Sequence, residues 1–448
     1  MSEEKRPNVV VFFTDQQRWD TSSLYGNPMD LTPNFDRTAM EGVHFYNACT
    51  NQPVCLPARV VFQTGRYASN FKCYNNGGEL PTGTTTLGHR FRDAGYQTGY
   101  IGKWHLCHEE PVPKERRDGY DYWLGANVLE FVSDAYQTTV YDGDGNEVHL
   151  PGYRVDALAD AAIRYIDDSK DNPFFLFLSF LEPHFQNTRD DYPAPTGYEQ
   201  RYLDNWTPPD LRALGGSSAH HLPGYYGMVK RLDEAYGRVL DALKSLKLLD
   251  DTIVLYTADH GCHFKTRNGE YKRSCHESSA RIPMAMTGPG FTSGGRIQDM
   301  VSLIDIPPTL LDACNIPIPD DMQGRSMLPL LRGDREGWPE EVYMEICESH
   351  LSRAVRTRRW KYSIQKTDNE RFQGESWQFK EDFLYDLMAD PYELVNVIGN
   401  ESYRKVADVM KERLIRRMKE AGEPVPEIIN AEPIRGGQRR ILEEEVYQ

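Results

Sequence analysis

Four groups of polar residues follow four segments whose composition is typical of buried strands. The groups are Asp15 and Gln16, Lys103 and His105, Glu182 and His184, and Asp259 and His260. In open parallel sheets, ligand sites form at the carboxyl ends of the strands. A strand-end Asp alone is often a helix cap, and a lone His is more often a structural residue. Taken together, the four groups predict one crevice that they all face.

Two of these groups contain the donor atoms that a divalent cation needs. They offer carboxylate oxygens, an amide oxygen and an imidazole nitrogen, from Asp15, Gln16, Asp259 and His260. The oxygens suit Ca²⁺ or Mg²⁺, and the imidazole leaves Mn²⁺ or Zn²⁺ open. The sequence therefore predicts a site for one divalent metal, with Ca²⁺ as the ion that we expect first.

A cysteine stands near the start of a predicted helix in Pro53-Val-Cys55-Leu-Pro57-Ala-Arg59. Pro57 tolerates a first-turn helical position, so the helix is expected to run from there to about Thr64. The N-terminus of a helix favours anions, and Arg59 lies one turn after Cys55, where it could hold an oxyanion attached to residue 55. The alternative is a buried structural cysteine, and the short pattern alone does not separate the two.

Strands and helices alternate through the first three quarters of the chain. Apolar runs predict buried strands at 8–14, 97–102, 174–180 and 252–257. Three-to-four spacing predicts one long helix at 222–247, and further helices are expected at 155–168 and 304–314. In the last of these, Pro307 and Pro308 are expected to break the helix near its start. The alternation is typical of an α/β fold with a large mixed, mostly parallel sheet sandwiched by helices.

The pattern changes after about residue 340. Short alternating stretches at 342–347, 354–358 and 360–365 predict a small antiparallel sheet, and a charged helix is expected near 401–420. We therefore predict a catalytic α/β domain over 1–340, a C-terminal α+β subdomain over 341–421 and a C-terminal extension over 422–448. The extension is expected to be either a solvated tail or an arm that reaches a neighbouring copy in a homo-oligomer.

Composition excludes several classes of partner. The 448 residues carry a net charge of -16, which repels nucleic acid and anionic membranes. Apolar runs are far shorter than a membrane span, and the first residues lack a secretory pattern, so we expect a cytoplasmic protein. The eight cysteines show no CxxC spacing, which argues against a zinc ribbon. An anionic substrate must then be held by a local positive cluster.

The motif residues resemble the sulfatase family of the alkaline phosphatase superfamily. Cys55-Leu-Pro-Ala-Arg59 followed by Thr64-Gly65-Arg66 is similar to the signature in which the cysteine becomes formylglycine. Other segments agree in order, namely Pro7 to Val11 with Asp15, Leu31 to Arg37, Gly102 to His105, Ala258 to Gly261, Lys272 to Pro283, and Leu384 to Leu387 with Asp390. The resemblance covers residues 7 to 400. It implies an alkaline phosphatase-like fold and maturation by a formylglycine-generating enzyme.

The resemblance also implies a role for each motif residue. The metal ligands would be Asp15, Gln16, Asp259, His260 and residue 55 as formylglycine. The catalytic residues would be Cys55, Arg59, Lys103, His105, His184 and Lys272. Among these, Arg59 and Lys103 would stabilise the hydrated aldehyde, and His105 would assist its regeneration. The substrate would be bound by Lys103, His184, Lys272 and His276, with His276 either touching the leaving group or supporting residues that do.

Two positions depart from the common family pattern. Many members have acidic or Asn side chains where Gln16 and His260 stand here, and these variants also occur in related phosphonate and phosphodiester hydrolases. Glu277 and Arg281 look structural, as residues that fix the loop presenting Lys272.

The sequence is therefore compatible with three functions. The leading prediction is an arylsulfatase-like enzyme acting on a small anionic sulfate ester of a sugar or aryl alcohol. The alternative is a phosphonate monoester or phosphodiester hydrolase, and a catalytically silent binding protein is disfavoured because every expected catalytic position is filled. The leaving group would be read by loops at 105–150, 185–222 and 345–382, which carry no general code.

Overall fold

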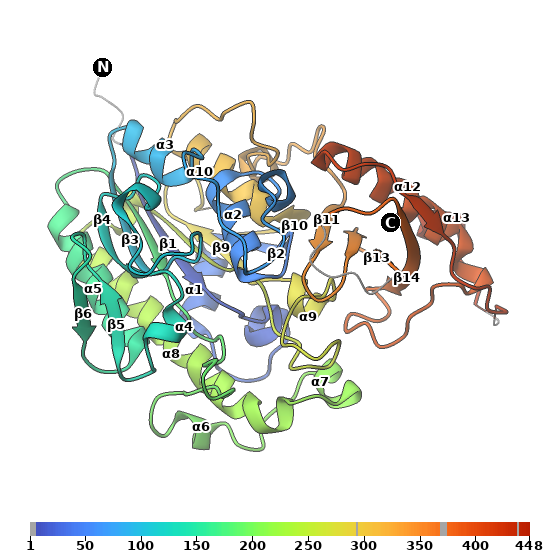
Figure 1. Cartoon of the computed structure of the whole chain (residues 1–448), viewed down its shortest axis with the longest axis horizontal. Coiled ribbons are helices and arrows are strands. Elements are labelled where there is room, and N and C mark those ends of the chain that lie inside the picture. Colours follow the sequence, from blue (N-terminus) through green and yellow to red (C-terminus); the bar gives the residue numbers. More distant parts are fainter. Residues whose placement is uncertain (1–5, 293, 368–373, 437–438) are drawn as a thin grey trace.

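The computed structural model describes residues 6–292, 294–367, 374–436 and 439–448 (Figure 1). Within these residues, a 10-stranded sheet runs in the order β10-β2-β9-β8-β1-β7-β3-β4-β5-β6. Its strands are β1 (Asn8–Thr14), β2 (Val43–Cys49), β3 (Gln97–Lys103), β4 (Tyr122–Ala126), β5 (Thr138–Tyr141), β6 (Glu147–Leu150), β7 (Phe174–Ser179), β8 (Thr252–Ala258), β9 (Met284–Thr287) and β10 (Gly295–Ser302). The predicted α/β class and mostly parallel sheet are confirmed.

The four predicted strands form the parallel centre of this sheet, β8-β1-β7-β3. Phe13 of β1 is in register with Ser179 of β7 and Thr257 of β8, and Ser179 is in register with Gly102 of β3. The carboxyl ends of the four strands are therefore level at one edge. The sheet is mixed because β9 runs antiparallel between β8 and β2, and β5 and β6 are antiparallel at the far end.

Side chains of β1 alternate between two apolar cores, one on each face of the sheet. Val10 and Phe12 pack with α1 (Pro33–Glu41), α5 (Arg154–Ser169) and α8 (Ser218–Ser245). The intervening Val9, Val11 and Phe13 pack with α2 (Cys55–Thr64), α3 (Leu87–Asp93) and α10 (Ile306–Ala313). Burial on both faces explains why the central strands are continuously apolar. Among the described residues, no helix combines the length and apolar character that crossing a bilayer requires.

One helix differs from its prediction. Leu303–Asp305 forms a 3-10 turn, and α10 begins at Ile306 with Pro307 in its first turn. The two prolines thus start the α-helix and do not break it, because a first-turn proline lacks only an N–H that would have no intrahelical partner. The remaining short helices are α4 (Leu129–Val132), α6 (Tyr198–Arg201), α7 (Pro209–Leu214), α9 (Glu277–Ala280) and α11 (Leu328–Leu331).

The C-terminal part forms a second, smaller sheet beside the first, coloured orange to red in Figure 1. Its antiparallel strands are β11 (Val342–Ile346), β12 (Ser352–Arg356), β13 (Trp360–Gln365) and β14 (Gln378–Asp386). The helix α12 (Arg404–Ala421) packs against β12 and β13. This sheet and helix agree with the predicted antiparallel subdomain.

The stretch after Gly422, expected to be a solvated tail or an arm, returns to this second sheet. Its strand β15 (Glu427–Ile429) pairs in parallel with β14. Near the chain end, α13 (Glu443–Val446) is anchored because the Glu445 carboxylate lies 2.8 Å from Arg359 and the Glu445 carbonyl accepts from the Trp360 indole at 2.7 Å. The acidic run is thus partly paired with cations of its own subdomain.

Candidate active site

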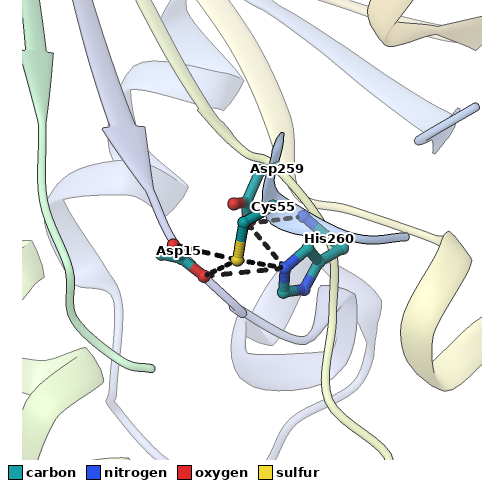
Figure 2. Close-up of side chains that lie close together, drawn as sticks. All are labelled: Asp15, Cys55, Asp259 and His260. Carbon is teal, nitrogen blue, oxygen red and sulfur yellow. Dashed lines mark hydrogen bonds and ion pairs between the residues drawn. The ribbon is translucent and has the colours of Figure 1, made fainter. Parts of the chain in front are cut away.

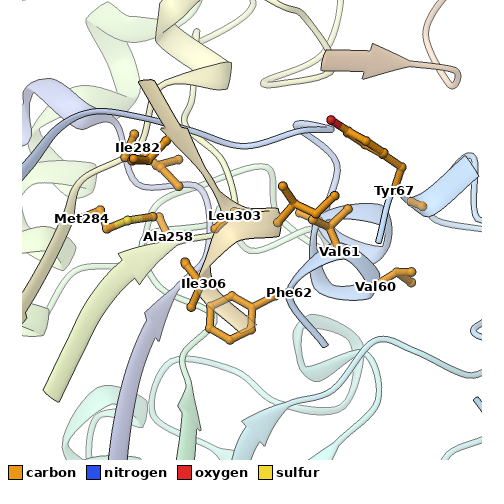
Figure 3. Packing of buried hydrophobic residues seen from close by; sticks show 14 of the residues in the cluster. Val60, Val61, Phe62, Tyr67, Ala258, Ile282, Met284, Leu303 and Ile306 are labelled. Carbon is orange, nitrogen blue, oxygen red and sulfur yellow. The ribbon is translucent and has the colours of Figure 1, made fainter. Parts of the chain in front are cut away.

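Helix α2 carries Cys55 to the edge where the parallel strands end. The helix begins at Cys55 itself, after Val54 in an extended conformation, and every residue of α2 is buried. Val60, Val61 and Phe62 pack into the apolar cluster with Leu303 and Ile306 (Figure 3). This packing holds the first turn of α2, and therefore residue 55, in a fixed position.

The Cys55 thiol lies at the centre of a buried polar cluster (Figure 2). Its Sγ is 3.5 Å from both carboxylate oxygens of Asp15 and 3.3 Å from Nε2 of His260. One ligand atom from each of Asp15, Cys55, Asp259 and His260 lies within 4.8 Å of the others. The loop after β1, the loop after β8 and the start of α2 therefore meet at one point.

Three cations surround this point. Lys272 Nζ lies 2.6 Å from Cys55 Sγ. Lys103 Nζ lies 2.9 Å from Asp15 Oδ2 and 3.8 Å from the same sulfur. The Arg59 guanidinium lies 3.1 Å from Asp15 and 3.5 Å from Asp259. An anion attached to or approaching residue 55 would therefore meet concentrated positive charge.

The cluster shifts the pKa values of its acids in opposite directions. Burial opposes the ionisation of Asp15, but Lys103 and other nearby cations hold its pKa well below the usual value. Burial, together with Asp15, raises the pKa of Asp259 to about 7. Burial and Asp15 also disfavour a thiolate at Cys55, yet Lys103 and Lys272 lower its pKa to about 7. Position 55 thus favours a negatively charged atom.

The residues predicted to bind metal fit a divalent cation. The amide nitrogen of Gln16 donates to the Tyr192 hydroxyl at 3.1 Å, whereas its Oε1 is buried and has no hydrogen-bond partner within the described part of the chain. Oδ2 of Asp259 likewise has no hydrogen-bond partner there, and its nearest cation is Arg59 at 3.5 Å. The His260 Nδ1 lies 2.9 Å from the carbonyl of Gly261, which leaves the Nε2 lone pair facing residue 55. Unpaired oxygens and an oriented imidazole are the donors that such an ion uses.

The other predicted histidines occupy three different environments. His184 Nδ1 lies 2.7 Å from the Phe185 carbonyl, and its Nε2 lies 3.1 Å from Lys272 Nζ. His105 follows β3 with a left-handed backbone (φ 57°) and is buried beside the cluster. Burial and Lys103 lower the pKa of His105 to about 3, so its imidazole is neutral in this structure.

His276 lies apart from the groups that contact Cys55. Its ring nitrogens face the hydroxyls of Ser274 and Tyr385, and it lines a cavity of about 320 Å³ shared with the second sheet. The neighbouring Glu277 pairs with Arg281 at 3.6 Å.

Two acidic residues behave differently from what their sequence positions suggest. Glu182 shares a strand end with His184, but its carboxylate pairs with Arg154 at 2.8 Å and is not among the groups around residue 55. Conversely, the sequence pattern does not indicate Glu130, although its carboxylate lies 2.8 Å from Lys103 Nζ. The available signal was the short strand β4, since Glu130 follows its carboxyl end by four residues.

Two family models match the chain. The sulfatase model matches residues 7–316, and the model for the C-terminal part of N-sulphoglucosamine sulphohydrolase matches residues 269–420. An ulvan-active sulfatase from Formosa agariphila is 30% identical over 94% of this chain and 83% of its own length. An N-acetylglucosamine-6-O-sulfatase from Bacteroides thetaiotaomicron is 25% identical over 90% of this chain and 84% of its own.

Solved structures share the whole architecture. The sulfatase yidJ from Bacteroides fragilis superposes with a TM-score of 0.81 at 26% identity, over 95% of this chain and 98% of that one. The phosphonate monoester hydrolase of Agrobacterium radiobacter has the same fold, with a TM-score of 0.68 at 23% identity over 93% and 96% of the two chains.

Proposed function

Because the chain belongs to the sulfatase family and is thus a sulfuric ester hydrolase, we propose that it acts on the sulfate ester of a carbohydrate or an aryl alcohol, with residue 55 as formylglycine. The observation that carries this proposal is the setting of Cys55. Its sulfur lies 2.6 Å from Lys272 Nζ, 3.3 Å from the His260 imidazole and 3.5 Å from the Asp15 carboxylate. These groups stabilise an oxygen nucleophile at the place that the sulfur marks.

An aldehyde hydrate suits this place better than a thiol does. A thiol is a poor partner for hard oxygen-binding cations, whereas a hydrate offers two hydroxyl groups. The residues that would hold the cation are Asp15, Gln16, Asp259 and His260. Ca²⁺ is the ion that we expect first, with Mg²⁺, Mn²⁺ or Zn²⁺ as alternatives, and a bound ion would lower the pKa of a neighbouring hydroxyl.

The surrounding side chains would bind the sulfuryl group and move the protons. One hydroxyl of the hydrate attacks sulfur while the S–O bond to the substrate alcohol breaks, and Lys103, Lys272 and Arg59 stabilise the developing charge. One such donor contributes on the order of 3 kcal/mol to the transition state. His105 then takes the proton of the second hydroxyl, so that the aldehyde re-forms as sulfate leaves. His184, 3.1 Å from Lys272, would bind a sulfuryl oxygen or protonate the leaving alcohol.

A polar cavity apart from the groups that contact Cys55 has a lining that suits a carbohydrate. His276 and Ser274, which closely follow Lys272 in the chain, line it together with His350 and Asp382 of the C-terminal part. Its volume of about 320 Å³ admits part of a sugar, and its hydroxyl, imidazole and carboxylate groups match sugar hydroxyls. We therefore propose that His276 contacts the leaving group. Two relatives whose names specify saccharide substrates agree with this class.

The test combines mass analysis with a substrate screen. The protein is co-expressed with a formylglycine-generating enzyme, and the tryptic peptide that contains residue 55 is expected to carry an aldehyde. Sulfated mono- and disaccharides are then assayed beside 4-nitrophenyl sulfate. An intact thiol in fully active protein would contradict the nucleophile that we propose.

A second candidate is hydrolysis of a phosphonate monoester or phosphodiester at the same site. It is favoured by the residue types at two predicted ligand positions, since Gln16 and His260 are variants that also occur in related phosphonate and phosphodiester hydrolases. The comparison of kcat/KM on 4-nitrophenyl sulfate and bis(4-nitrophenyl) phosphate decides between the two, and we expect the sulfate to be preferred.

A further inference from the structure

A buried carboxylate outside the metal donor set lies beside Lys103. Glu130, in α4, is 4% exposed, and its Oε1 lies 2.8 Å from Lys103 Nζ. The same ammonium group lies 2.9 Å from Asp15 Oδ2. One positive charge is therefore shared between two carboxylates. Because Asp15 belongs to the metal donor set, Glu130 is the group whose charge remains to offset Lys103.

Glu130 is held in place from its backbone and remains ionised. The side-chain amide of Gln186 donates to the Glu130 carbonyl at 2.7 Å, and Arg154 donates to Gln186 at 3.3 Å. Burial opposes the charge, but Lys103 lowers the pKa of Glu130 to about 2. The position of this charge is therefore fixed relative to the anion-binding cations.

The second oxygen of Glu130, Oε2, is buried and has no hydrogen-bond partner within the described ranges of the chain, as holds for single oxygens of Glu110, Glu182 and Glu393. Leaving a buried charged acceptor unpaired is costly. The carboxylate offsets the charge of Lys103, and it also places a fixed negative charge beside the cations that surround residue 55.

We infer that Glu130 restricts the site to monoanionic esters by repelling a second negative charge on the ligand. This inference rests on the proposed function, because a sulfate ester carries a single charge. A phosphate monoester carries two above its second pKa of about 6, and the inorganic sulfate product also carries two. Glu130 acts through Lys103 and through space, as a positioning residue, and it also favours release of the product.

The expected effect of the Glu130 charge on ligand affinity follows from Coulomb's law. Lys103 Nζ lies 2.8 Å from Glu130 Oε1 and 3.8 Å from Cys55 Sγ, so the Glu130 carboxylate lies within about 7 Å of residue 55. At an effective dielectric constant of about 20, one extra charge at about 7 Å changes binding by roughly tenfold or more. Loss of the Glu130 charge should change the affinity for dianions relative to the affinity for monoanions, whereas a general loss of structure would weaken the binding of both.

Binding of two sulfate species provides the test. Metal-loaded wild type and Glu130→Gln are titrated calorimetrically with inorganic sulfate, a dianion, and methyl sulfate, a monoanion. Glu130→Gln is expected to tighten sulfate about tenfold relative to methyl sulfate. Its kcat/KM on 4-nitrophenyl phosphate relative to 4-nitrophenyl sulfate should rise by a similar factor. Because the titration requires no turnover, it remains decisive even if the proposed hydrolysis fails.

Three variants control this experiment. Glu130→Asp keeps the negative charge, so its ratio of affinities for inorganic sulfate and methyl sulfate should equal that of wild type. Glu381→Gln removes a buried carboxylate that pairs with Arg404 at 2.6 Å in the second sheet, and should leave the ratio unchanged. If Glu130→Gln does not fold, Glu130→Ser removes the same charge in less space and takes its place. A ratio that stays within about twofold of wild type in the folded neutral variant would overturn the inference.

Discussion

Two buried ionic clusters of the molecule differ in how their charges are paired. The catalytic cluster consists of Asp15, Cys55, Arg59, Lys103, Asp259, His260 and Lys272. The interface cluster consists of Glu277, Arg356, Lys361 and Glu393 and connects α9 to the second sheet. Both combine carboxylates with cations, and both are buried.

In the interface cluster, the charged groups face opposite charges of the protein itself. Glu277 binds the Arg356 guanidinium through both oxygens at 2.8 Å, and Lys361 Nζ lies 2.6 Å from Glu277 and 2.8 Å from Glu393. In the catalytic cluster, Lys272 faces a sulfur and two imidazoles and, within the described part of the chain, forms no ion pair with a carboxylate. The difference indicates which cluster is completed by a ligand and which by the fold.

Removing residue 55 should produce the largest effect. We expect Cys55→Ala to lower kcat/KM on 4-nitrophenyl sulfate by at least about 10⁴-fold, because the nucleophile is lost while the fold is retained. Steady-state kinetics and thermal unfolding measure the two effects separately. Residual activity within about tenfold of wild type would mean that residue 55 does not supply the nucleophile, and the cluster around it could then not be called catalytic.

Two lysines separate catalysis from stability. Lys272→Ala should lower kcat/KM by about 10²- to 10³-fold, since it removes one donor to the developing charge. Lys361→Ala instead leaves two interface carboxylates with less compensation and should cost on the order of 3 kcal/mol of unfolding free energy. Urea unfolding and kinetics on both variants check this. Similar losses of activity in the two folded variants would break the distinction between the clusters.

The parallel centre of the fold and the strand-end groups could be predicted because both depend on short-range pattern. A strand buried on both faces must be continuously apolar, and parallel strands with level ends place Asp15, Lys103, His184 and Asp259 at one edge. Glu182 occupies the same edge, but a cation on α5, Arg154, takes its carboxylate. A partner on a distant helix has no signature in local sequence.

Other features depend on contacts that sequence spacing does not encode. The strand before Glu130, β4, is only five residues long and includes Gly125, so its sequence gives a weak strand signal. The chain after Gly422 is polar, and its composition predicts a tail. In the structure, however, Glu445 forms an ion pair with Arg359, and β15 pairs with the edge of β14. In both cases, the tertiary partner decides the outcome and the local composition does not.

Removal of the divalent ion should affect the catalytic cluster alone. A ligand present at about 100 times its Kd stabilises the native state by about 2.7 kcal/mol, so chelation should lower Tm by a few degrees and addition of Ca²⁺ should restore it. Asp259→Asn should lose most of this shift, whereas Lys361→Ala should retain it from a lower starting Tm. Thermal unfolding with and without chelator measures all three proteins, and an equal shift in Asp259→Asn would contradict the predicted ligand set.

Acid should destabilise the protein through protonation of Glu277 in the interface cluster. This is the smallest of the four predicted effects. Burial disfavours the ionised carboxyl, but Arg356 and Lys361 hold its pKa well below the usual 4.5. The native state therefore binds fewer protons than the unfolded state as the pH falls below 4.5, and the stability that Glu277 contributes above this pH is lost progressively.

The difference in unfolding free energy between wild type and Glu277→Gln should be about 3 kcal/mol near neutral pH and should shrink by about 1 kcal/mol at about pH 3.5. Urea unfolding across this range measures it, with the exposed Glu401→Gln as a control that should change stability by less than about 0.5 kcal/mol throughout. A difference that stays constant with pH would mean that Glu277 is not held ionised by its two cations. The interface cluster would then be no better paired than the catalytic one.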